Sequence, residues 1–151
     1  MSWALRTAGP GDAEAMAAIH ATVGHPGWSA RDFSTWLSRK ETIAMLAEAE
    51  DKAPAAFALA LIGGDDADIL MIATASQMQR LGAARATLQA LAEEASRRGV
   101  GRLVLEVARN NAPALALYKG EGYVEIGVRP GYYRQAGGLV DAIVLARPLA
   151  P

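Results

Sequence analysis

A strand, a small-residue turn and a helix follow one another between residues 69 and 98, and this succession limits the possible folds more than any other feature. Residues 69–74 form an apolar run of strand length, and a helical pattern extends over residues 84–98. The connection ends in Gln79-Arg80-Leu81-Gly82-Ala83-Ala84-Arg85. A small-residue turn at a helix start leaves several backbone N–H groups without partners, which suits a phosphate group. An ordinary strand–helix connection explains the same residues about equally well.

The small residues of this turn allow a ligand to approach the backbone closely. Gly82 can adopt a positive φ angle, and Ala83 and Ala84 add little bulk. A nest of N–H groups of this kind is suited to a pyrophosphate, and Arg80 and Arg85 would add positive charge beside it.

The composition predicts one domain over residues 1–151, with 52% hydrophobic residues to build its core. A net charge of −1 gives no sign of direct nucleic-acid binding. Cysteine is absent and His20 and His25 are the only histidines, so we expect no disulfide and no metal site. The chain has no apolar run of membrane-spanning length and no signal-peptide pattern at its start, so we expect a cytoplasmic protein without membrane contact. The sequence leaves the oligomeric state open, and a monomer is the simplest expectation.

The hydrophobic patterns predict the order β-α-α-β-β-β-α-β-α-β-β. The expected strands cover residues 3–6, 43–49, 55–62, 69–74, 103–107, 123–128 and 139–145, and the expected helices cover 12–24, 29–37, 84–98 and 113–118. Ser29 followed by Asp32 predicts a capping box at the second helix. A loop containing Pro130, Gly131, Gly137 and Gly138 is expected to join the last two strands.

This order, with a Gln-x-x-Gly-x-Gly/Ala turn between the fourth strand and the third helix, resembles the GNAT acyltransferase superfamily over nearly the whole chain. The second half is similar to the RimI-type N-alpha-acetyltransferases, which act on ribosomal protein N-termini. The residues that carry this resemblance are Leu105-Glu106-Val107, Asn110-Asn111, Ala116-Leu117-Tyr118, Gly122-Tyr123, Arg129-x-x-Tyr132-Tyr133 and Asp141-Ala142-Ile143. Pro26-Gly27-Trp28-Ser29 is similar to the family's Pro-Trp-Ser segment with one glycine inserted.

The chain departs from the family pattern at three places near the turn. Ala84 stands where a second glycine is usual, Leu81 replaces a commonly polar residue, and Ala75-Ser76-Gln77 replaces the usual Asp-Pro. None of these changes removes a chemical group that acetyl transfer needs.

The resemblance implies an α+β fold of three layers. It would have a mixed, mostly antiparallel sheet of about seven strands, with the fourth and fifth strands splayed apart, flanked by four helices. It also implies acetyl-CoA as the co-substrate. The pyrophosphate would bind Gln79, Arg80, Leu81, Gly82, Ala83, Ala84 and Arg85, and the pantetheine arm would run along Ile72, Ala73 and Thr74. A backbone N–H near Ile72 would polarise the thioester carbonyl, and Asn111 would contact the pantetheine or cap the following helix.

Glu106 is the candidate general base. It is the one charged residue within the apolar run from Leu103 to Val107, where the pattern offers no structural reason for a carboxylate. The resemblance implies that Glu106 faces the cleft between the splayed strands. There it would take the proton of the amine, either directly or through a water molecule. An edge-facing or salt-bridged glutamate is the structural alternative.

Aromatic residues supply the remaining candidates. Tyr118 would by resemblance donate a proton to the departing thiolate, although a locally packed tyrosine explains its spacing as well. Trp28, Tyr132 and Tyr133 are candidates for binding the acceptor peptide, with packing within their loops as the alternative. Arg129 is expected to order its loop. His20 is expected on a helix surface or near the end of the first helix, without a role.

The function that the resemblance implies is transfer of an acetyl group from acetyl-CoA to an N-terminal alanine amine of a ribosomal protein, protein eighteen of the small subunit. The α-amine has a pKa of ~8 and lysine ~10.4, so neutralising it at pH 7 requires roughly 3 kcal/mol less. The alternatives are a GNAT enzyme for another protein, a lysine or a small amine, a non-catalytic acetyl-CoA-binding module, and a plain structural α/β domain.

Overall fold

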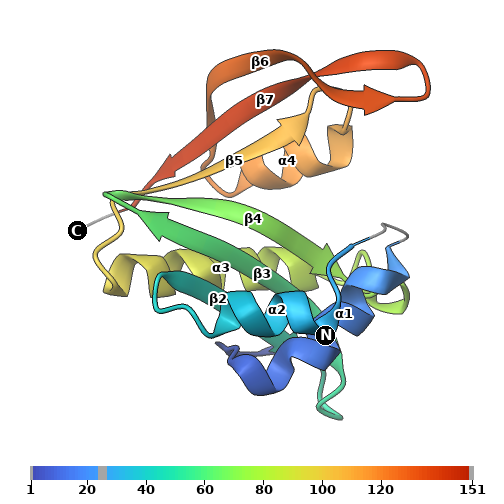
Figure 1. The fold of residues 1–151 in the computed structure, drawn as a ribbon, viewed down its shortest axis with the longest axis vertical. Helices are drawn as coiled ribbons and strands as arrows, with labels where there is room; N and C mark the ends of the chain where they lie inside the picture. The colour runs from blue at the N-terminus through green and yellow to red at the C-terminus, as the bar shows by residue number, and fades with distance from the viewer. Residues whose placement is uncertain (1, 24–26, 150–151) are drawn as a thin grey trace.

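The computed structural model describes residues 2–23 and 27–149, and its centre is one sheet of seven strands. The strands lie in the order β1-β2-β3-β4-β5-β7-β6 (Figure 1). Their bounds are β1 Ala4–Thr7, β2 Thr42–Glu48, β3 Pro54–Gly63, β4 Asp66–Thr74, β5 Arg102–Ala108, β6 Val124–Gln135 and β7 Gly138–Pro148. All neighbouring strands are antiparallel except β4 and β5, so the predicted fold class is confirmed.

Helices cover both faces of the sheet and bury a large apolar core on each face. Their bounds are α1 Ala13–Thr22, α2 Ala30–Leu37, α3 Ala83–Arg97 and α4 Ala112–Gly120, with short 3₁₀ turns at Pro10–Asp12 and Ser76–Met78. Helices α1 and α2 pack on one face of β2–β4, around Met16, Phe33 and Phe57. Helix α3 packs on the opposite face, where its Leu88 and Leu91 join the core that extends to α4 (Figure 1). No helix in the described part of the chain is long and apolar enough to cross a membrane.

Local sequence signals explain how these helices begin. At α2 the predicted capping box is present, because Asp32 N donates to Ser29 Oγ at 3.3 Å and Ser29 N donates to Asp32 Oδ2 at 2.9 Å. Helix α3 begins after Gly82, whose φ of 87° is the left-handed conformation expected of that glycine. The predicted end of α1 at Gly24, together with His25 and Pro26, lies outside the described residues.

The parallel pair β4–β5 opens the sheet. These strands pair only from Asp66 with Arg102 to Asp68 with Val104, and beyond this point they diverge (Figure 1). Strands β5, β7 and β6 therefore form a separate wing of the sheet. The opening between the two wings is the separation of the fourth and fifth strands that the family resemblance implied.

The loop predicted between the last two strands is much shorter than expected, because only Gly137 of its predicted residues Pro130, Gly131, Gly137 and Gly138 lies in the turn. Strands β6 and β7 form one long hairpin, and the residues from Arg129 to Tyr133 belong to β6. The ladder is interrupted between Arg129 and Tyr133, which allows Pro130, a residue without an N–H donor, to sit within the strand. Gly131 has a φ of 59°, and its N–H donates to Asp141 Oδ1 at 2.9 Å. The Pro and Gly residues thus mark an irregular strand instead of a loop.

Candidate active site

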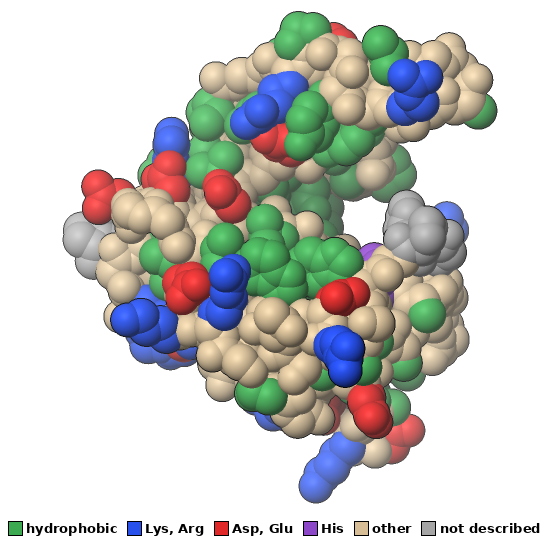
Figure 2. All heavy atoms as spheres, in the orientation of Figure 1, with side chains coloured by type: hydrophobic (Ala, Val, Ile, Leu, Met, Phe, Trp, Pro, Cys, Tyr) green, Lys and Arg blue, Asp and Glu red, His purple; other side chains and the backbone are tan. Residues whose placement is uncertain are grey.

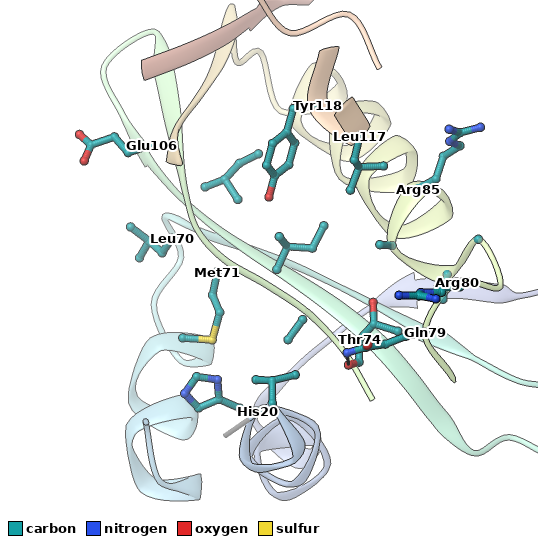
Figure 3. Close-up of a pocket in the computed structure, with 17 residues that line it drawn as sticks. His20, Leu70, Met71, Thr74, Gln79, Arg80, Arg85, Glu106, Leu117 and Tyr118 are labelled. Carbon is teal, nitrogen blue, oxygen red and sulfur yellow. Dashed lines mark hydrogen bonds between the residues drawn. The ribbon is translucent and has the colours of Figure 1, made fainter. Parts of the chain in front are cut away.

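Two cavities meet where the sheet opens. The larger, of about 720 Å³, lies between β4, the start of α3 and α4, and the smaller, of about 440 Å³, lies between the start of β4, β5 and β6. Ile69, Leu70 and Glu106 line both. Figure 2 shows the molecule deeply hollowed between its two wings, and Figure 3 shows the side chains around the larger cavity. Two molecules bound in the two cavities would therefore meet at these three residues.

The larger cavity brings together most of the residues predicted to bind acetyl-CoA. Its lining includes Ile72, Ala73, Thr74, Gln79, Arg80, Gly82, Ala83, Ala84 and Arg85. Leu81 lies outside it: its side chain is exposed, and its carbonyl oxygen accepts a hydrogen bond from Trp3 Nε1 at 3.2 Å. This contact fixes the turn to the N-terminal strand.

The turn before α3 has the backbone geometry of an anion site. Arg80 and Gly82 have φ angles of 65° and 87°, and such left-handed residues curve the chain so that successive N–H groups converge. The N–H groups of the first turn of α3 have no earlier carbonyl within the helix to bond. Arg85 adds a cation, with Nε 3.4 Å from Glu121 Oε2. The turn therefore offers both partial and full positive charge to a phosphate.

Strand β4 is irregular where it borders the cavities. Met71 pairs with Leu59 and Ile69 pairs with Ala60 on β3, so Leu70 is an extra residue with no partner opposite. This bulge reverses the alternation of side chains, since Ile69 and Ile72 pack on the α3 side and Met71 packs toward α1 and α2. On the other edge β4 has no ladder partner beyond Asp68. Backbone groups of β4 along the cavity are thus open to an extended ligand, as proposed for the pantetheine arm.

Glu106 projects from β5 at the junction of the cavities. Its neighbours Leu105 and Val107 point into the core, so strand alternation directs Glu106 to the opposite face, where its side chain is 25% exposed. Arg129 Nε lies 2.7 Å from Glu106 Oε1. The structural alternative of a salt-bridged glutamate is therefore realised, but at a position open to both cavities. Arg129 pairs with the candidate base, a role that the predicted loop did not suggest.

Tyr118 lies on α4 at the wall of the larger cavity (Figure 3). It is only 7% exposed, and its ring packs edge-on against Tyr123 with the centroids 5.7 Å apart. Burial raises the pKa of Tyr118 to about 12, with a smaller contribution from nearby Tyr133. The phenol consequently keeps its proton throughout the neutral range.

Besides Leu81, two of the predicted ligand-binding residues lie outside both cavities. Asn111 caps α4, since its Oδ1 accepts a hydrogen bond from Ala114 N at 3.3 Å. Trp28 stacks on Trp36 with centroids 5.6 Å apart and also contacts Phe33. Both therefore have the structural roles that the sequence analysis kept as alternatives.

Tyr132 and Tyr133 line the smaller cavity together with Arg129. Their rings pack edge-on with the centroids 5.1 Å apart. The Arg129 guanidinium lies over the Tyr132 ring, 5.5 Å from the centroid of that ring. Burial raises the pKa of Tyr133, and the carboxylate of Glu106 adds to the shift. The paired tyrosines thus form an aromatic wall beside the candidate base.

His20 is a cavity residue that the sequence analysis missed. Of the two predicted placements, the position near the end of α1 is found and the surface position is not, because His20 is 8% exposed, packs edge-on against Phe33 and lines the larger cavity (Figure 3). Its spacing of four residues from Met16 places it on the apolar stripe of α1, which is the signal that could have revealed it. Within the described residues, no group of three or more metal-ligating side chains is close enough to hold an ion.

Comparison with known proteins decides the family. The acetyltransferase (GNAT) family pattern matches residues 13–123, which is well over half of the chain. The protein belongs to the GNAT acetyltransferase family.

Among its GNAT relatives, the ribosomal protein bS18-alanine N-acetyltransferase of Escherichia coli K12 is 42% identical over 96 residues, covering 64% of this chain and 65% of that protein. The Salmonella typhimurium protein of the same name is 41% identical over 100 residues, covering 66% of this chain and 68% of its own length. The aligned segment thus spans just under two thirds of the Escherichia coli relative.

Solved structures extend the similarity over the whole chain. The crystal structure of the ribosomal-protein-S18-alanine N-acetyltransferase from Escherichia coli has a TM-score of 0.88 at 31% identity, covering 99% of this chain and 96% of that one. Arabidopsis thaliana NAA60, solved in complex with a bisubstrate analogue, has a TM-score of 0.83 at 18% identity, covering 98% of each chain. The second likeness concerns the fold alone.

Proposed function

We propose that this protein transfers an acetyl group from acetyl-CoA to the N-terminal α-amine of a protein, with the alanine N-terminus of ribosomal protein bS18 as the acceptor. The observation that carries the proposal is the junction of the two cavities at Glu106. A thioester bound from one side and an amine bound from the other would meet beside a carboxylate. The names of the Escherichia coli and Salmonella relatives support the choice of acceptor.

The larger cavity fits acetyl-CoA by its chemistry. The first-turn N–H groups of α3, together with Arg80 and Arg85, would hold the pyrophosphate. The unpaired edge of β4 at Ile72, Ala73 and Thr74 would hydrogen-bond the amide groups of the pantetheine arm, and an N–H near Ile72 would polarise the carbonyl oxygen. Acetyl-CoA would supply the activated acyl group.

Glu106 and Tyr118 would move the protons. The neutral α-amine would attack the thioester carbonyl carbon, and Glu106 would accept the proton that this nitrogen loses, directly or through water, as the carbon–nitrogen bond forms. When the carbon–sulfur bond breaks, Tyr118 would donate its proton toward the thiolate, and the phenol would regain it from solvent. The raised pKa of Tyr118 ensures that the donor is present at neutral pH.

Mass spectrometry of acetyl transfer to two hexapeptides tests the proposal. One peptide has a free Ala-Arg N-terminus, and the other has a blocked N-terminus and an internal lysine. We expect transfer to the first alone, reduced about 100-fold or more in Glu106→Gln and in Tyr118→Phe. Glu125→Gln is the matched control, because Glu125 is exposed on β6 and lines neither cavity.

The other outcomes distinguish the alternative functions. Transfer to the lysine alone would assign the protein to another branch of GNAT chemistry. Acetyl-CoA binding without transfer to either peptide would indicate a small-molecule acceptor or a non-catalytic module. A fully active Glu106→Gln protein would remove Glu106 from the mechanism.

A further inference from the structure

The charges that line the smaller cavity are not balanced. Among the described residues, its ionisable carboxylate and guanidinium side chains are Asp68, Glu106 and Arg129. Arg129 pairs with Glu106 at 2.7 Å, whereas Asp68 forms no ion pair with any described residue. Asp68 is exposed, so it retains its water and is open to a ligand. The cavity therefore has one carboxylate without a compensating cation.

Asp68 lies at a defined distance from the candidate base. It pairs with Val104 on β5, the residue two positions before Glu106, and both Val104 and Glu106 line the smaller cavity. Val104 lies about 7 Å along β5 from Glu106 and Asp68 lies about 5 Å across from Val104, so the backbone positions of Asp68 and Glu106 are about 8–9 Å apart. This is the distance over which an extended peptide, with its α-amine at Glu106, places its second and third residues.

We infer that Asp68 selects acceptors with a cationic side chain in their first three residues. The inference rests on the proposed function and names a specificity residue of the same site. A lysine or arginine side chain extending from the acceptor backbone would reach Asp68, and its aliphatic part would pass over the apolar floor at Val104 and Val144. An acidic side chain there would be repelled.

The size of the preference for a cationic side chain follows from the exposure of Asp68 to water. A pair of exposed charges contributes modestly because water screens it, so a well-placed cation should raise kcat/KM by about 3- to 10-fold. The preference should decline as salt is added, because the Debye length falls from ~10 Å at 0.1 M to ~3 Å at 1 M.

The test uses the full-length protein and alanine hexapeptides that carry one arginine at position two, three or five. All three peptides have the same net charge, so position five reports general attraction. We expect the wild type to favour arginine at position two or three over position five by about 3- to 10-fold in kcat/KM. Asp68→Asn should bring this ratio to about one. Asp68→Lys should favour arginine at position five over positions two and three, and should favour a peptide with glutamate at position two or three.

Asp65→Asn is the matched control. Asp65 is also exposed and lies just before β4, but it lines neither cavity, so its removal should leave the wild-type ratio. A ratio near one in the wild type, or an unchanged ratio in folded Asp68→Asn protein, would overturn the inference alone. Absence of transfer to every N-terminal peptide would instead refute the proposed function together with the inference drawn from it.

Discussion

Replacing Gly82 by alanine tests the proposed phosphate-binding role of the turn before α3 without touching a charged side chain. Gly82 has a φ of 87°, and a Cβ added there would meet no atom within 4 Å. The substitution therefore creates no clash, and its effect comes from the left-handed backbone, which costs an L-residue about 1–2 kcal/mol. If the turn relaxes to avoid this strain, the N–H groups shift away from the phosphate. Losing one hydrogen bond to a charged group, about 1.5–3 kcal/mol, would weaken acetyl-CoA binding at least about tenfold.

Gly99→Ala provides the comparison, since Gly99 follows the other end of α3, has a φ of 82° and is equally open. Both variants should lose similar stability in urea unfolding. Calorimetric titration with acetyl-CoA should show weaker binding only for Gly82→Ala. Equal affinities in the two variants would refute the assignment of the turn as the phosphate site.

Two further predictions concern ion pairs. Arg129→Gln should lower kcat about tenfold, because it releases the Glu106 carboxylate, and should leave the KM for acetyl-CoA unchanged. Arg129→Lys should restore part of the rate. An equal loss of rate in both variants would contradict a role of the charge. Hydrogen bonds from Arg6 lower the pKa of Asp12 below its usual 3.8, so the stabilisation is present above that pH and is lost as the pH falls through the folded-state value. Urea unfolding should therefore show that the stability difference between wild type and Asp12→Asn shrinks below pH 4, and a difference that stays constant would contradict this coupling.

The sequence predicted the features that depend on neighbouring residues. The capping box at Ser29 and the left-handed Gly82 are consequences of local hydrogen bonding and backbone freedom. The sequence predicted less well where tertiary contacts override local preference. Pro130 and Gly131 indicated a loop. Pairing with β7 on both sides of them nevertheless extends β6 through this point, and the interruption of the ladder there accommodates the proline.

Local chemistry along the chain thus determined the order of the elements, the left-handed turn before α3 and the position of Glu106 within an apolar run of β5. Only the tertiary structure decided what surrounds that residue. The divergence of β4 and β5 after Asp68 opens two cavities onto Glu106, and the antiparallel pairing of β6 with β7 brings Arg129 against it from a distant part of the chain. These contacts depend on strand register and sheet twist, which result from packing the whole core and leave no pattern in any short segment.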